Sequence, residues 1–304
     1  MNEPQKEKFI TREVGKHARA FILIAGVVFA VEAINFIAPD VIQKEKPATN
    51  IVAGGGARDK GNTLERVELS AEWGNLGMRM VETGVIDRAK FEALYQGRGG
   101  LTEDEKRFLE TNMKGNIVVT QENAGFILNL LWGLGLGNEN TILEKGQMAD
   151  ARYGGAGGFA STGGWTLANG DAMEHYSAHP FITLTQKQQR MVESVSGNIY
   201  RPCCNNPAIF PDCNHGMAML GLLELLVSQG ATEEQMYKAA LQMNRFWFTN
   251  QYATIDRYLE SKGRVPSEVS PKEILGKEYS SASGFARVAE SVKGVPQGGG
   301  GCSV

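Results

Sequence analysis

Several of the patterns that identify protein classes are absent from this chain. It contains no GxSxG elbow, no HExxH helix and no protein-kinase signature. It also lacks the cysteine and histidine spacings of zinc fingers and zinc ribbons, and the CxxCH motif that attaches haem. The reaction classes that these motifs identify are therefore not expected.

Excess positive charge is also absent. Lysine and arginine total 31 against 34 acidic residues, and no long basic run could neutralise a phosphate backbone. We therefore expect no nucleic acid among the partners. A chain of 304 residues with 42% hydrophobic residues can bury the core of one large domain.

One long apolar run lies near the N-terminus. Residues 20–38, AFILIAGVVFAVEAINFIA, are apolar except for Glu32 and Asn35, and about 20 such residues span a membrane as a helix. Basic residues precede the run, which favours a cytoplasmic N-terminus: Lys6, Lys8, Arg12, Lys16 and Arg19. We expect a cytoplasmic segment over 1–19, a single-pass transmembrane anchor over 20–38, and a main domain outside the cytoplasm.

Two other interpretations of residues 20–38 remain open. A cleaved signal peptide needs a small-x-small site, and the residues after Phe29 offer no convincing one. A buried core helix is favoured by Glu32, because an acidic residue inside a membrane costs about 2.5–3.5 kcal/mol on insertion scales.

The rest of the chain predicts a mainly α fold, an irregular multi-helix domain with long glycine-rich loops. We expect a linker over 39–61, the globular domain over 62–295, and a flexible glycine-rich tail over 296–304 that ends near Cys302. Helix starts are predicted from capping-box pairs: Asn62 with Glu65 (a helix to Gly84), Thr102 with Glu105, Thr120 with Asn123, Thr185 with Gln188, and Thr232 with Gln235.

Further elements follow from periodicity and caps. Asp87 is expected to cap a short helix to Leu94, and the apolar segment 124–136 predicts a central core helix. Residues 117–120 and 181–185 resemble short strands, which allows one small strand pair at most. The glycine-dense segment 153–171 matches neither a P-loop nor a dinucleotide fingerprint, so we interpret it as a packed surface loop and expect no nucleotide cofactor.

The strongest chemical signal is a cysteine and histidine cluster. Cys203, Cys204, Cys213 and His215 fall within thirteen residues, and the loop that carries the cysteines is constrained by three prolines, Pro202, Pro207 and Pro211. Asp212 is expected to be the N-cap of the apolar helix that follows, with Cys213 and His215 in its first turn. The unpaired amides and dipole of a helix N-terminus lower the pKa of a thiol.

Thiolates with an imidazole favour a soft metal such as Zn, Cu or an iron–sulfur centre. The leading hypothesis is a membrane-anchored, extracytoplasmic protein that binds or handles such a metal ion. His175 and His179, four residues apart with Glu174 beside them, are candidates to complete the site; alternatively one caps or hydrogen-bonds locally and the other is solvated. Adjacent Cys203 and Cys204 can share one ion only with backbone strain.

Two alternatives to metal binding stay open. In a thiol-dependent redox or nucleophilic enzyme, Cys213 would be the nucleophile, His215 would tune it and another cysteine would resolve the intermediate. In a structural protein, a disulfide from Cys213 to Cys203 or Cys204 would staple a domain that binds another envelope protein. Cys302 is either a mobile ligand or resolving thiol, or a plain tail residue.

Several other residues give weaker signals. Tryptophan and methionine at helical spacing are expected in the core rather than in a cofactor site: Trp73, Trp132, Trp165, Trp247, Met217, Met219, Met236 and Met243. Glu122 and Glu224 stand in apolar surroundings and are candidates for buried acids with shifted pKa values.

Overall fold

The computed structural model describes residues 66–292. The predicted cytoplasmic segment, anchor and linker (1–19, 20–38 and 39–61) and the tail with Cys302 lie outside the described residues. Within residues 66–292, no helix combines the length and the apolar character needed to cross a membrane.

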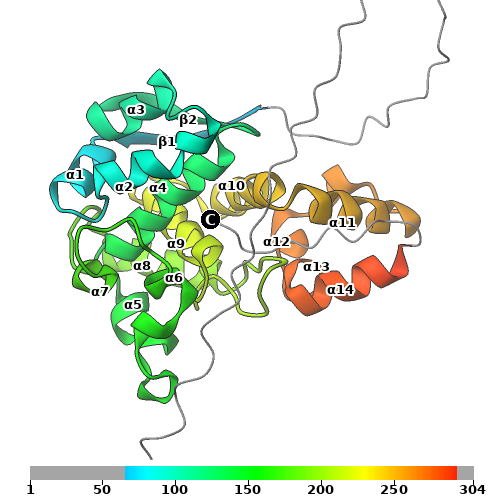
Figure 1. The fold of residues 1–304 in the computed structure, drawn as a ribbon. Helices are drawn as coiled ribbons and strands as arrows, with labels where there is room; N and C mark the ends of the chain where they lie inside the picture. The colour runs from blue at the N-terminus through cyan, green and yellow to red at the C-terminus, as the bar shows by residue number, and fades with distance from the viewer. Residues whose placement is uncertain (1–65, 293–304) are drawn as a thin grey trace, which may run out of the picture. The chain divides into compact units, whose positions relative to one another are not determined.

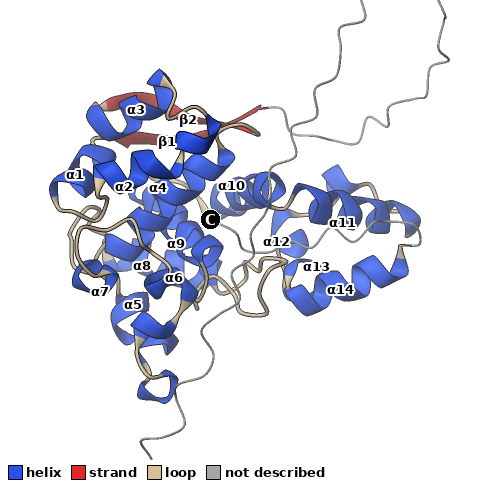
Figure 2. Ribbon diagram, viewed as in Figure 1, coloured by secondary structure: helices blue, strands red, loops and turns tan. Residues whose placement is uncertain are grey.

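The fold is mainly α, as predicted, with one two-stranded sheet (Figures 1 and 2). The strands are β1 (Arg66–Gly74) and β2 (Met113–Thr120). The helices are α1 (Leu76–Glu82), α2 (Arg88–Leu94), α3 (Glu103–Glu110), α4 (Ala124–Gly137), α5 (Thr141–Lys145), α6 (Ala160–Gly163), α7 (Ala172–His175), α8 (Gln186–Ser196), α9 (Asn214–Ser228), α10 (Glu233–Trp247), α11 (Thr249–Ser261), α12 (Pro271–Ile274), α13 (Lys277–Ser280) and α14 (Ala282–Ser291).

Helices α4 and α9 pack against each other at the centre of the core, with α6, α8 and α10 around α9 (Figure 1). Both helices are buried almost all round, which is the pattern of helices enclosed by others. They approach closely where Gly135 faces Gly221. The approach leaves no room for a side chain there, since a Cβ on Gly221 would overlap the carbonyl oxygen of Leu131. This contact fixes the helix whose N-terminus carries Cys213.

Replacing Gly221 with alanine is expected to lower the free energy of unfolding by about 1–3 kcal/mol, because the added methyl group forces α4 and α9 apart. Gly125 is the matched control. It lies on the exposed side of α4 with no atom within 4 Å of an added Cβ, so Gly125→Ala should raise stability by about 0.5–1 kcal/mol. Urea unfolding of both variants measures the difference, and equal effects would refute the close-contact explanation.

The helix predicted from Asn62 to Gly84 is wrong over its described part. Residues 66–74 form strand β1, and only 76–82 are helical. Burial alternates along β1, with Val67, Leu69, Ala71 and Trp73 inside, which is the two-residue period of a strand. β1 pairs antiparallel with β2. The predicted strand at 117–120 is thus confirmed, whereas 181–185 forms no strand.

Three predicted capping boxes are confirmed: Thr102 with Glu105, Thr185 with Gln188, and Thr232 with Gln235. Asp87 also caps α2 as predicted. The pair Thr120 and Asn123 does not form a box, because Thr120 ends β2 and the Asn123 side chain accepts a hydrogen bond from the Thr120 amide. The segment 153–171 contains the short helix α6 and buried Trp165 rather than only a surface loop.

Candidate metal centre

Residues 197–213, which we call the cysteine loop, connect α8 to α9. Cys213 ends the loop as the N-cap of α9. The Cys213 Sγ accepts a hydrogen bond from the Gly216 amide at 3.4 Å. The prediction that Asp212 is the cap is therefore wrong by one residue. Asp212 instead accepts side-chain hydrogen bonds from Arg201 at 3.2 Å and Asn206 at 2.7 Å. These contacts direct its carboxylate toward Arg201 and Asn206 in the same loop.

The three sulfurs of the loop lie next to one another. The Sγ of Cys204 is 3.1 Å from that of Cys213, Cys203 is 3.8 Å from Cys213, and the adjacent Cys203 and Cys204 are 3.4 Å apart. None of the three forms a disulfide. The clustering that the sequence predicted for these cysteines is present in the structure.

His215, in the first turn of α9, joins this cluster. One ring nitrogen and the sulfurs of Cys203 and Cys213 all lie within 4.8 Å of one another. The ring packs against Phe248 and Trp247, with centroid distances of 4.5 and 5.7 Å. These aromatic rings pack against the imidazole, which is half-buried.

Arg201 is the residue of the site that the sequence analysis missed. Its side chain is fully buried, and its guanidinium donates to the Asn206 carbonyl, the Asp212 carboxylate and the Cys213 sulfur. A buried cation requires compensating negative charge. Asp212 supplies one anion, and a thiolate at Cys213 supplies a second.

The surroundings of Cys213 and Cys204 shift the pKa values of the two thiols in opposite directions. Hydrogen bonds from Cys203 and Cys204, helped by the Arg201 charge and by His215, hold the pKa of the Cys213 thiol well below its ordinary value despite burial. The hydrogen bond with Cys203 lowers the pKa of Cys204, but the hydrogen bond to Cys213 and burial outweigh it and raise that pKa to about 12. Cys213 is therefore the sulfur that carries negative charge first.

The charge of Arg201 fits this arrangement. Burial opposes the guanidinium charge, but the sulfurs of Cys213, Cys204 and Cys203 outweigh burial and raise the Arg201 pKa. Burial also raises the pKa of Asp212. The site thus contains a buried guanidinium with two anionic partners, the Asp212 carboxylate and the Cys213 thiolate. The thiolate is a suitable metal ligand.

His175 and His179 lie together but form no part of either ligand group found around Cys213 among residues 66–292. His175 Nδ1 is 3.1 Å from His179 Nε2, and His175 Nε2 is 2.8 Å from the Asn169 carbonyl. Since a carbonyl only accepts, His175 carries its proton on Nε2 and accepts from His179 at Nδ1. The two histidines thus hydrogen-bond each other, and neither ring is exposed, which differs from the alternative in which one of them is solvated.

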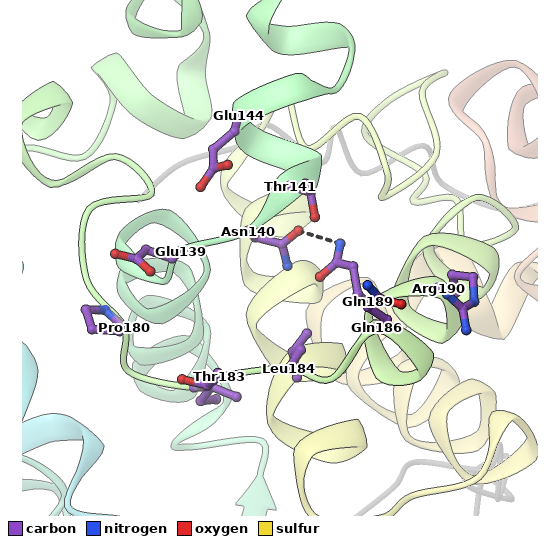
Figure 3. Close-up of a pocket in the computed structure, with 11 residues that line it drawn as sticks. Glu139, Asn140, Thr141, Glu144, Pro180, Thr183, Leu184, Gln186, Gln189 and Arg190 are labelled. Atoms are coloured by element: carbon purple, nitrogen blue, oxygen red, sulfur yellow. Dashed lines mark hydrogen bonds between the residues drawn. The ribbon is translucent and has the colours of Figure 1, made fainter.

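Of the two acid candidates, Glu224 is buried and Glu122 is exposed. Burial raises the pKa of Glu224 to about 8. Its carboxyl accepts from the Asn140 amide, and Asn140 in turn accepts from Gln189 at 2.9 Å. Asn140 and Gln189 meet beside a cavity of about 430 Å³ that Glu139, Glu144 and Leu184 also line (Figure 3). No cysteine lines this cavity.

The cysteine loop is also held by the C-terminal helices. The Ala282 amide donates to the Cys204 carbonyl at 2.9 Å, and the Ser283 amide donates to Asn205 Oδ1 at 2.8 Å. Both donors belong to the first turn of α14. The position of Cys204 therefore depends on a helix almost eighty residues further along the chain.

Comparisons with protein-family models, with curated proteins and with solved structures gave no match.

Proposed function

We propose that this protein binds one soft transition-metal ion through Cys203, Cys213 and His215, with Cys204 beside the ion. The observation that carries the proposal is the convergence of these ligand atoms within 4.8 Å. A tetrahedral zinc with bonds of 2.3 Å to sulfur would separate two sulfurs by about 3.8 Å. The Cys203 and Cys213 sulfurs are 3.8 Å apart.

Charge balance supports an ion of low charge. Two thiolates neutralise Zn²⁺, which leaves Arg201 paired with Asp212 at 3.2 Å. Cu(I) with the same thiolates leaves one negative charge beside the guanidinium, which stabilises it. Sulfur and imidazole ligands favour both ions, whereas an iron–sulfur cluster with four cysteines needs one more than the loop provides.

A thiol enzyme is the second candidate, and one observation favours it. Cys204 lies 3.1 Å from Cys213, at the place where a resolving thiol would be needed. However, only 6% of Cys213 is exposed, and a nucleophile must reach its substrate. Metal binding requires no such access for a large substrate, so we favour it.

We further propose that the domain is anchored in a membrane by residues 20–38 and works outside the cytoplasm. The support is the length of the apolar run and the basic residues before it.

The metal proposal predicts that the full chain, reduced and stripped with a chelator, takes up one equivalent of Co²⁺ or Zn²⁺. Thiolate bonds to Co²⁺ should produce a charge-transfer absorption in the near ultraviolet. Cys213→Ser should lose stoichiometric binding, whereas Cys302→Ser should bind like the wild type. Elemental analysis and titration measure both. Wild-type protein that binds no metal, but whose Cys213 is alkylated rapidly at pH 6, would replace the metal proposal with the thiol enzyme.

A further inference from the structure

Two groups of ligand atoms overlap at Cys213. The first contains Cys203, Cys213 and His215, and the second contains Cys204, Asp212 and Cys213. In each group, the ligand atoms lie within 4.8 Å of one another. Cys213 is common to both, so an ion can pass from one group to the other while its bond to Cys213 is kept.

The adjacent cysteines belong to different groups. Each group takes one of the two adjacent cysteines, Cys203 in the first and Cys204 in the second. Their sulfurs remain 3.4 Å apart. One can therefore replace the other on an ion after a short displacement.

The two groups differ in contact with solvent. In the first, the His215 ring is covered by Phe248 and Trp247, and its Nδ1 has no exposed surface. In the second, the Asp212 side chain is 21% exposed and Cys204 is partly exposed. Cys203 is partly exposed as well, so the groups differ in their third ligand: the Asp212 side chain reaches solvent, whereas the Nδ1 of His215 does not. Asp212 therefore marks the side from which another molecule can reach the ion.

Cys204 is held in place independently of the metal. Its carbonyl accepts from the Ala282 amide, its own amide donates to the Arg201 carbonyl, and Asn205 beside it accepts from Ser283. The backbone on both sides of Cys204 is thus held by hydrogen bonds, and its sulfur lies 3.1 Å from that of Cys213. This preorganisation is what a waiting ligand needs.

We propose that Cys204 and Asp212 form an exit position, so that the protein delivers its ion to an acceptor with thiolate or imidazole ligands. The inference rests on the proposed metal function. The Cys204 sulfur bonds to the ion and releases its proton to water, the Cys203 sulfur leaves the ion and takes up a proton, and an Asp212 oxygen replaces the His215 nitrogen. The bond to Cys213 persists, and no atom changes oxidation state.

The test compares Cys204→Ser with Cys203→Ser in the full chain loaded with one equivalent of Zn²⁺. Each variant replaces one sulfur with oxygen at adjacent positions, which makes them matched controls. Stopped-flow mixing with excess chromophoric chelator measures release. Cys204→Ser should keep one equivalent of Zn²⁺ but release it at least about tenfold more slowly, whereas Cys203→Ser should lose tight binding. Circular dichroism checks the fold.

The outcomes separate the two proposals. If Cys204→Ser binds and releases Zn²⁺ like the wild type, the exit position is refuted and the metal site stands. If Cys204→Ser cannot hold Zn²⁺ while remaining folded, Cys204 is a permanent ligand and the exit position is again refuted. If the wild-type chain binds no Zn²⁺ at all, both proposals fail.

Discussion

Replacing Arg201 with methionine is expected to lower the free energy of unfolding by about 3–5 kcal/mol. The guanidinium is fully buried and donates to Asp212, Asn206 and Cys213. Without it, the Asp212 carboxylate and the neighbouring Cys213 thiolate lose the positive charge that both of them contact. Urea unfolding of the reduced, metal-free protein measures this loss.

Arg264 provides the matched control. It pairs with Glu273, but the two side chains are 39% and 42% exposed, and exposed pairs contribute about 0–1 kcal/mol. Arg264→Met should therefore change stability little. A loss at Arg201→Met no larger than that at Arg264→Met would show that the buried guanidinium does not balance the charges of the cysteine loop.

The second large effect concerns Glu224 and pH. Its pKa is about 8 in the folded chain against an ordinary value of 4.5. Below the lower value the carboxyl is protonated in both states. Between the two values only the unfolded state releases the proton, so the free energy of unfolding falls as pH rises, by about 1.4 kcal/mol per unit and about 5 kcal/mol in total. Above pH 8 this slope vanishes.

Glu224→Gln should remove this part of the pH dependence, because the amide oxygen still accepts from Asn140 but cannot ionise. Unfolding curves from pH 4.5 to 9 for both proteins measure the difference, in chelator so that metal binding does not contribute. The stability of the variant relative to the wild type should increase with pH across this range. Parallel curves would show that Glu224 keeps an ordinary pKa in the folded chain.

Helix starts were the most predictable part of the fold, because capping is local. Thr102, Thr185 and Thr232 each bond the residue three positions later, and this contact is visible in the sequence. β1 was missed for the opposite reason. Its partner β2 is some forty residues away, and Leu69 and Leu76 fit a helical spacing until the alternation of Val67, Leu69, Ala71 and Trp73 is given more weight.

The cysteine cluster was predictable because its members are close in sequence. The role of Arg201 was not, since arginine is rarely buried and nothing at its position marks it as the exception. The only sequence signal is its place directly before Pro202 and the paired cysteines. The contact of Cys204 with α14 was likewise hidden, because backbone hydrogen bonds such as that from Ala282 leave no pattern in residue type.

The attachment of the cysteine loop to α14 has a consequence for synthesis of the protein. The ribosome makes Cys203, Cys204 and Cys213 long before it makes Ala282 and Ser283, whose amides fasten the loop. Domains generally fold as units while the chain emerges. A nascent chain arrested before residue 282 would thus carry the three cysteines in a loop that lacks its contacts to α14, at the stage when a disulfide with another thiol forms most easily.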